Sequence, residues 1–141
     1  RYVVVDDEAF LNILKPVKVR TALNTVSDTD IGTYEDTYDT FFPASLEQEY
    51  IVPQLTNTEG EYWEYWKRRL GLTSPQAQGS GGTNPAHIRY AYDAKTSVQN
   101  CRLRSALRGY AHHAWHVTST GYAYNSNATY AFRCAPACVI C

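Results

Sequence analysis

Three of the four histidines lie close together in a stretch without any charged side chain. His112, His113 and His116 belong to residues 109–132, GYAHHAWHVTSTGYAYNSNATYAF, which contain no Asp, Glu, Lys or Arg. Imidazole binds metals and exchanges protons near neutral pH. On a strand, however, His112 and His116 share one face and His113 the other, and the only acid in the second half of the chain, Asp93, is distant in sequence. We therefore predict three polar aromatic surface residues rather than a metal or catalytic site.

The cysteines are the other candidates for metal or nucleophilic chemistry. Cys134, Cys138 and Cys141 have the spacing C-x3-C-x2-C, and Cys101 or a histidine could complete a zinc site. Residues 135–140 resemble a short apolar strand, which would turn Cys138 and Cys141 to different faces. We predict buried free thiols, no metal and no cofactor. A disulfide that involves Cys101 stays open, because four cysteines allow three pairings.

Five acidic side chains between residues 27 and 39 are candidate calcium ligands. Carboxylates are the donors that Ca²⁺ prefers, but the spacing of an EF-hand loop is not present. Because the segment is rich in turn-forming residues, we predict a solvated loop rather than a calcium site. The five side chains are Asp28, Asp30, Glu35, Asp36 and Asp39.

The length and composition predict one domain over residues 1–141. Hydrophobic residues make up 44% and charged residues 19%, so the chain can bury a core and is not wholly disordered. No apolar run approaches the roughly 18 residues of a membrane helix, so we predict no membrane insertion. No signal peptide opens the chain and it has no Met, which favours a processed product or a C-terminal fragment of a longer protein.

Charge is distributed unevenly along the chain. Thirteen acids and four bases up to residue 64 give −9, and nine bases with one acid thereafter give +8, for a total of −1. The bases are dispersed except in Lys67-Arg68-Arg69, at the end of a predicted helix where cations interact favourably with the helix dipole. We predict that the two halves pair with each other and that the protein binds no nucleic acid.

The pattern of elements predicts an α+β fold, with two helices early and a mostly antiparallel β meander at the C-terminus. The first helix follows a capping box of Ser45 and Gln48 and stops at Pro53. The second spans residues 59–70 up to Gly71, and we assign its aromatic stripe to the core. Strands are expected at residues 2–5, 16–26, 87–92, 98–103, 114–117, 122–124 and 137–140.

Residues 109–132 have the composition of a recognition surface. Tyr offers a large amphipathic contact area with few torsions to order, while Ser and Asn supply adaptable hydrogen bonds. The lack of charge avoids the cost of desolvating unpaired ions when a partner binds. A Tyr-rich sheet face packed inside the protein is the alternative, but it would need a hydrogen-bond partner for every buried polar group. We predict a surface role.

The C-terminal third resembles the ending of variable proteins of diversity-generating retroelements, many of which come from phages of gut bacteria. Two upstream segments, FPASLE at residues 42–47 and EGEYWEYW at residues 59–66, resemble the helical part of the same family. The resemblance covers residues 40–141, whereas residues 1–40 match no part of it. The C-terminal motifs are LRSA at 103–106, AWxV at 114–117, Gly121 and AxxAxRCAPACVI at 128–140.

The resemblance implies a C-type-lectin-like fold in which residues 104–141 form the variable ligand-binding region. In this family a reverse transcriptase rewrites adenines of a template copy, so AAY codons become Tyr, His, Asn, Ser, Ala, Asp or Phe codons but not Trp codons. The resemblance therefore implies a fixed framework of Trp115, Val117, Gly121, Ala128, Ala131 and Pro136. The implied variable, ligand-facing residues are Tyr110, His112, His113, His116, Tyr122, Tyr124, Asn125, Asn127, Tyr130 and Phe132.

The implied function is non-enzymatic binding of a ligand or receptor. The module would be displayed on a phage virion for host attachment, or on a bacterial cell surface, with a protein or glycan on a bacterial surface as its partner. A homo-oligomer is compatible with this interpretation. The chain has Ala106 where the family often has Pro, and it lacks the sugar-binding signatures of calcium lectins, so calcium-dependent sugar binding is not implied.

Two other classes of function remain as alternatives. A structural virion protein would use the Tyr-rich strands as a contact between subunits. An enzyme of the formylglycine-generating type, on a related lectin-like scaffold, would use a pair of cysteines such as Cys134 and Cys138. Loss of turnover in a Cys→Ser variant would favour the enzyme, and a stable oligomer that buries residues 110–132 would favour the structural protein.

Overall fold

The computed structural model describes residues 7–23, 34–52, 59–78, 84–89, 97–110 and 112–140. Over these residues the protein is α+β, with few helices and short antiparallel sheets, as expected from the sequence. The elements are α1 (Glu8–Ile13), β1 (Leu14–Lys15), β2 (Val17–Ala22), β3 (Tyr34–Asp39), β4 (Phe42–Pro43), α2 (Glu64–Leu70), the 3₁₀ turn η1 (Pro85–His87), β5 (Cys101–Ala106), β6 (His113–Val117), β7 (Ala123–Asn127), β8 (Pro136–Ala137) and β9 (Val139–Ile140).

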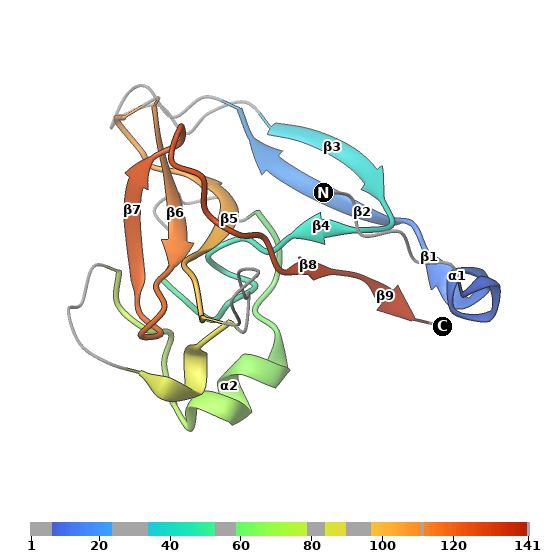
Figure 1. Ribbon diagram of the computed structural model, residues 1–141, viewed down its shortest axis with the longest axis horizontal. Helices are drawn as coiled ribbons and strands as arrows, with labels where there is room; N and C mark the ends of the chain where they lie inside the picture. Colours follow the sequence, from blue (N-terminus) through green and yellow to red (C-terminus); the bar gives the residue numbers. More distant parts are fainter. Residues whose placement is uncertain are drawn as a thin grey trace.

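The largest described sheet is the three-stranded meander β5-β6-β7 (Figure 1). Its strands are consecutive in the chain and antiparallel, which confirms the expected C-terminal meander. The strands expected at 98–103 and 122–124 begin later, at Cys101 and Ala123. Three two-stranded antiparallel sheets, β1-β9, β2-β3 and β4-β8, lie to one side of it in Figure 1, and two of them join the end of the chain to its first third.

The hydrophobic core lies between one face of the meander and the segment that follows β4. Alternation along β5 buries Cys101, Leu103 and Ser105, because successive side chains of a strand point to opposite faces. The cluster is formed by Ala44, Leu46, Ile51, Leu103, Trp115, Val117 and Ala123, with Trp63 and Leu107 packed against it. The opposite face of the meander carries His116 and Tyr124.

The helix predicted after Ser45 is wrong, although its capping interactions are present. The Ser45 N–H donates to Gln48 Oε1 at 3.1 Å and the Gln48 N–H donates to Ser45 Oγ at 3.2 Å. The turn ends at Tyr50, which has φ 60, and Ile51 then forms a parallel bridge with Gln76. The reason is tertiary: both Leu46 and Ile51 are drawn into the core, so nearly every position of the turn is buried.

The second predicted helix is shorter than expected. α2 begins at Glu64 rather than Glu59 and ends, as predicted, at Gly71, whose φ of 63 gives the left-handed C-cap. Its only buried side chain is Trp66, while Tyr65 is 59% exposed. The assignment of the whole aromatic stripe to the core is therefore wrong, because two turns of helix place few residues on one face.

Two further predictions of local structure are corrected. His87, expected in a strand, lies in η1, and residues 90–92 of that expected strand are outside the described residues. Residues 34–39, expected as part of a loop, form β3, which pairs in register with β2. The strand expected at residues 2–5 is also outside the described residues, and Asp7 instead caps α1 by accepting from the Phe10 N–H.

In the described part of the acidic segment, Asp36 forms ion pairs with two cations of β2. Asp36 is 2.7 Å from Lys18 Nζ and 2.8 Å from Arg20 Nε, and hydrogen bonds from these cations hold its pKa well below the usual range. The described residues contain no group of three or more His, Cys, Asp or Glu side chains that could hold a metal. Asp28 and Asp30 lie outside the described residues.

Pairing between the two halves of the chain, as predicted, occurs at Glu49 and Arg89.

Candidate ligand-binding face

The ten residues implied as ligand-facing converge on β6, β7 and the turns beside them. We call this set the Tyr/His face: Tyr110, His112, His113, His116, Tyr122, Tyr124, Asn125, Asn127, Tyr130 and Phe132. β6 and β7 pair without irregularity from His113↔Asn127 to Val117↔Ala123, so residues six to fourteen positions apart become neighbours. Contacts between neighbours in sequence, such as His112–His113 and Tyr130–Phe132, are joined by contacts across the hairpin, such as His113–Asn125 and His116–Tyr124.

One group of contacts lies where the chain enters β6. The rings of His112 and His113 are 4.6 Å apart, and the Tyr110 ring is 5.7 Å from that of His113. His113 Nδ1 lies 3.0 Å from Asn125 Oδ1, which joins this group to β7. Tyr110 and His112 are exposed, whereas His113 and Asn125 are half-buried beneath them.

A second group lies along β7 and the turn that follows it. The centre of the Phe132 ring lies 4.5 Å from that of His116, with the two planes tilted by 53°, and the Tyr124 ring contacts the same imidazole at 6.0 Å. Tyr122 contacts Tyr124 at 6.2 Å, and Tyr130 contacts Phe132 at 6.1 Å. These five aromatic rings form one continuous set of contacts. Because side chains alternate along a strand, His116 and Tyr124 lie on the opposite side of the hairpin from His113 and Asn125, which share the side of Trp115.

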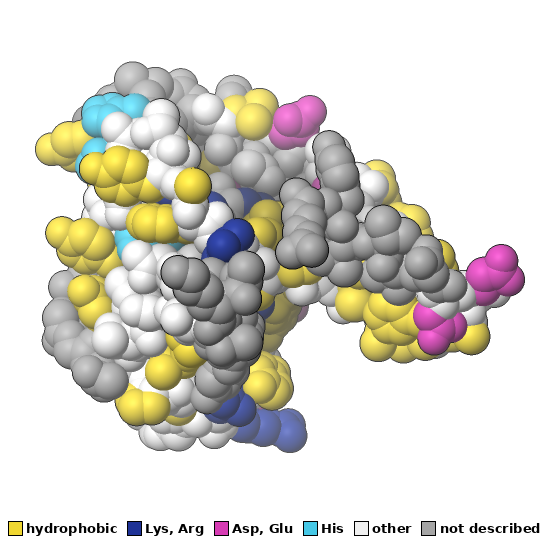
Figure 2. Space-filling model, in the orientation of Figure 1, with side chains coloured by type: hydrophobic (Ala, Val, Ile, Leu, Met, Phe, Trp, Pro, Cys, Tyr) yellow, Lys and Arg dark blue, Asp and Glu magenta, His cyan; other side chains and the backbone are white. Residues whose placement is uncertain are grey.

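The outermost side chains of the Tyr/His face are tyrosines. Tyr110 is 56%, Tyr124 50% and Tyr130 59% exposed. Figure 2 shows hydrophobic and histidine side chains gathered over β6 and β7, on the left of the view, with no Asp or Glu among them. The part of this face that the structure describes therefore offers aromatic area and hydroxyl groups without competing carboxylates, which suits a contact surface.

His116 is the exception, and its prediction as a surface residue is wrong. It is 1% exposed, because the register sets it between Arg102 of β5 and Tyr124 of β7 while Phe132 covers the ring. Burial, with a smaller contribution from the Arg102 guanidinium, lowers the pKa of His116 to about 4. His112 precedes β6, so these two histidines do not share a strand face. His116 therefore packs beneath Phe132 and Tyr124 as a buried member of the set.

The pKa of His116 predicts a specific loss of stability in acid. The folded-state pKa of about 4 lies below the ordinary value of 6.5, so the unfolded chain takes up the proton first as the pH falls. Wild type should lose about 2–3 kcal/mol more than the non-titrating His116→Phe variant between pH 7.5 and pH 4. Urea unfolding of both proteins at several pH values measures this difference. Parallel profiles would contradict the burial of a neutral imidazole.

Asn127 also has a local role in the structure. Its Oδ1 accepts the Thr129 N–H at 3.0 Å and the Thr129 hydroxyl at 2.9 Å, which shapes the turn after β7. The Ala128 N–H then donates to the His112 carbonyl at 2.7 Å. Asn127 therefore shapes the loop that carries Tyr130, a role that its sequence position alone did not indicate.

The framework residues implied by the resemblance divide into two kinds. Trp115 and Val117 are buried in the core, and Gly121, with φ 85, lies against the loop at Asn84. A Cβ at position 121 would lie 1.9 Å from the Asn84 carbonyl oxygen, so only glycine fits there without a shift. The others, Ala128, Ala131 and Pro136, are exposed.

The described cysteines are free, and the prediction that they are buried is wrong for Cys134, which is exposed. Cys101 is buried, its Sγ accepts the Ala135 N–H at 3.2 Å, and burial raises the pKa of its thiol. Burial also raises the pKa of Cys134, although this residue is largely exposed, and Cys138 is half-buried. A raised pKa reduces the thiolate fraction that a nucleophile or metal ligand requires. Cys141 lies outside the described residues.

A buried polar cluster that the sequence analysis missed lies between α2 and η1. Glu49 and His87 are both 0% exposed, with His87 Nε2 3.3 Å from Glu49 Oε2. Arg89 Nη1 is 2.9 Å from Glu49 Oε1, and its guanidinium lies 5.0 Å from the Trp66 ring. The other imidazole nitrogen faces Gln76 Oε1 at 3.0 Å. Glu49, His87 and Arg89 each contact another member of the cluster through an ion pair or a hydrogen bond, so we assign the cluster a structural role.

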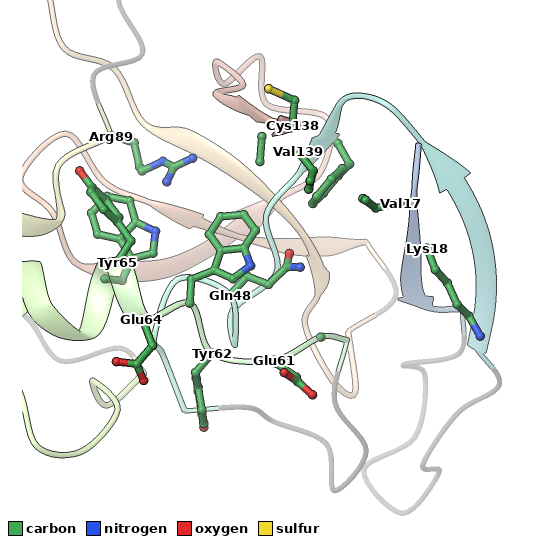
Figure 3. A pocket seen from close by; sticks show the side chains of 15 residues that line it. Val17, Lys18, Gln48, Glu61, Tyr62, Glu64, Tyr65, Arg89, Cys138 and Val139 are labelled. Atoms are coloured by element: carbon green, nitrogen blue, oxygen red, sulfur yellow. The ribbon is translucent and has the colours of Figure 1, made fainter. Parts of the chain in front are cut away.

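The structure also has an open groove of about 790 Å³ beside the start of α2. Figure 3 shows Glu61 and Tyr62 on one side of it and Cys138 and Val139 on the other. Trp63 and Phe42 add aromatic walls. The groove shares no lining residue with the Tyr/His face. In the sequence, the aromatic stripe at residues 62–66 was the feature that marked the position of this groove.

Comparisons with known proteins leave the geometry as the basis for any functional inference. No family model, no curated protein and no solved structure matches this chain. The two α-helices that the structure describes have six and seven residues, and no described helix is long and apolar enough to cross a membrane.

Proposed function

We propose that this chain is a non-enzymatic binding module with a C-type-lectin-like fold, whose Tyr/His face recognises a protein or glycan on a bacterial surface. A retroelement would diversify this face, and the module would be displayed on a phage virion for host attachment or on a bacterial cell surface. The observation that carries the proposal is the convergence of the implied variable positions. Nine of the ten, all except Asn127, contact another member through a ring contact or a side-chain hydrogen bond.

The separation of the exposed tyrosines from the core supports the same proposal. Trp115, Val117 and Ala123 occupy the buried side of β6 and β7, whereas the exposed tyrosines lie outside the core cluster. Side chains on such a surface can change without creating a cavity, and loops and sheet faces on a rigid scaffold are where binding residues concentrate.

The coding DNA gives the most direct test of diversification. We expect an imperfect copy of the segment that encodes residues 104–141 to lie near the gene. Its mismatches should fall at adenines in the codons for the exposed members of the Tyr/His face, and the codon for Trp115 should be unchanged. A genome without such a copy would contradict the retroelement and leave a fixed binding face or a subunit contact to explain the tyrosines.

Removal of the three most exposed tyrosines of the face should abolish binding without unfolding the protein. Contact tyrosines are typical hot spots, each worth about 1–2 kcal/mol, so the Tyr110→Ala, Tyr124→Ala and Tyr130→Ala triple variant should bind at least ~100-fold more weakly. Binding of the fluorescently labelled domain to a panel of gut bacterial strains, read by flow cytometry, measures this. The melting temperature should change little, because all three side chains are at least half exposed.

A matched control uses three aromatic residues elsewhere. Tyr38, Tyr62 and Tyr65 are 74%, 40% and 59% exposed, so their triple alanine variant removes a similar exposed aromatic area. It should retain wild-type binding. Equal loss of binding in both triple variants would mean that the adhesion is non-specific. A large fall in melting temperature in the first variant alone would assign the tyrosines to the core.

A further inference from the structure

Arg102 is placed to hold the backbone of the Tyr/His face from beneath. It lies on β5, opposite His116 of β6, and its guanidinium reaches across the sheet. Nη1 donates to the carbonyl of Ala114 at 3.0 Å and to that of Ser126 at 3.5 Å. Nη2 donates to the carbonyls of Asn127 at 3.1 Å and Tyr130 at 3.2 Å. One side chain thus joins β6, β7 and the following turn.

All four acceptors of Arg102 are main-chain oxygens. A carbonyl oxygen is present whichever side chain the residue carries, so these hydrogen bonds do not depend on the identity of residues 114, 126, 127 or 130. No described carboxylate forms an ion pair with Arg102, so the carbonyl dipoles take the place of a counter-ion. The planar fork of the guanidinium is suited to several acceptors at once, which a lysine ammonium cannot reproduce in the same geometry.

We propose that Arg102 is the positioning residue that keeps the backbone of the Tyr/His face constant while its side chains vary. This inference rests on the proposed function, because it explains how the face tolerates diversification. The stack of the guanidinium on the Phe132 ring, at 4.5 Å, adds a contact that depends on one variable residue. The four hydrogen bonds are the part that persists when Phe132 changes.

Arg104 provides a matched control on the same strand. Its guanidinium donates to the carbonyl of Arg20 at 3.1 Å, to that of Pro43 at 2.8 Å and to Gln48 Oε1 at 2.6 Å. It also donates to the Glu59 carbonyl. These acceptors belong to the first half of the chain and not to the Tyr/His face, so Arg104→Lys should weaken the fold without weakening the face selectively.

The test compares one displayed library in three backgrounds: wild type, Arg102→Lys and Arg104→Lys. The library randomises Tyr110, His112, Tyr122, Tyr124 and Tyr130 over Tyr, His, Asn, Ser, Ala, Asp and Phe, and protease resistance on the display host counts the folded members. Urea is first added so that the Arg102→Lys and Arg104→Lys parents have the same melting temperature. Under these conditions we expect the folded fraction of the library to be at least ~10-fold smaller in the Arg102→Lys background than in the Arg104→Lys background. Equal folded fractions in the two backgrounds would overturn the proposal.

Two further measurements separate the hydrogen bonds from the stack and from simple loss of folding. Phe132→Ala removes the stack but keeps the acceptors, so its folded fraction should remain near that of wild type. A fall equal to that of Arg102→Lys would overturn the assignment to the hydrogen bonds. In wild type and in Tyr124→Asp and Tyr130→Asn variants, ¹⁵N NMR should show the same slowly exchanging Arg102 guanidinium protons, even if Arg102→Lys cannot fold. Rapid exchange would contradict the proposal.

These measurements use no ligand. A protein that passes them but binds no bacterial strain would refute the proposed function and leave the role of Arg102 intact. A protein that binds bacteria through the three tyrosines, yet shows equal library tolerance with and without Arg102, would refute only the inference about Arg102.

Discussion

Replacing Glu49 with alanine should lower the free energy of unfolding by about 3–5 kcal/mol, because it would leave Arg89 and His87 without their buried acceptor. Both Glu49 and His87 are 0% exposed, and Arg89 Nη1 approaches Glu49 Oε1 to 2.9 Å. A loss of this size is a large fraction of the roughly 5–15 kcal/mol that stabilises an ordinary domain. Chemical denaturation followed by circular dichroism measures it.

An exposed ion pair gives the control for the same change of side chain. Glu64 lies 3.0 Å from Lys67 Nζ, with the two side chains 60% and 45% exposed. Glu64→Ala should lower the free energy of unfolding by no more than about 0.5 kcal/mol. Solvent screens such a pair, and the lysine side chain regains conformational freedom when the pair is lost. Similar losses in Glu49→Ala and Glu64→Ala would show that the buried cluster does not hold α2 and η1 against the turn that carries Glu49.

Trp115→Ala should be comparably damaging, with a loss of about 3–5 kcal/mol, because it empties a large volume in the core cluster. The side chain is 3% exposed, and its Nε1 forms no hydrogen bond with the described residues. Trp115→Phe should therefore cost much less than Trp115→Ala, since an aromatic ring still fills most of the space and no hydrogen bond is lost. Thermal and urea unfolding of the two variants test this order.

The adjacent strand supplies the control for Trp115. Tyr124→Ala removes an aromatic side chain from β7 that is 50% exposed, so it should cost less than about 1 kcal/mol. If Tyr124→Ala were as damaging as Trp115→Ala, the division of β6 and β7 into a core side and an exposed side would be wrong. That result would also remove the physical basis for changing the face without changing the fold.

The sequence predicted the strands and their order better than the helices. Residues 114–117 and 17–22 form strands as expected, because β-branched and aromatic residues alternate there with smaller or polar ones. The capping signal of Ser45 and Gln48 is present in the structure, but as a single turn. Local hydrogen bonds alone could not reveal that Leu46 and Ile51 would both be required in the core.

The candidate site was predicted as a set, and its internal division was not. Composition and the resemblance selected ten residues, and the structure brings them together on β6, β7 and the adjoining turns. His116 is buried and Tyr124 is exposed because a residue from outside the hairpin covers the first ring but not the second. Phe132, sixteen residues later, covers the imidazole, and no periodicity within β6 indicates such a distant contact.

By itself, the sequence determined the class of the fold, the C-terminal meander and the stretch of Tyr, His and Asn that contains the exposed tyrosines. Alternation and composition are local properties, and they suffice for these features. Only the tertiary structure decided that Glu49, His87 and Arg89 share one buried site and that Arg102 reaches four carbonyls on two strands and a turn. These contacts join residues many positions apart, and their formation depends on the packing of the whole chain around them.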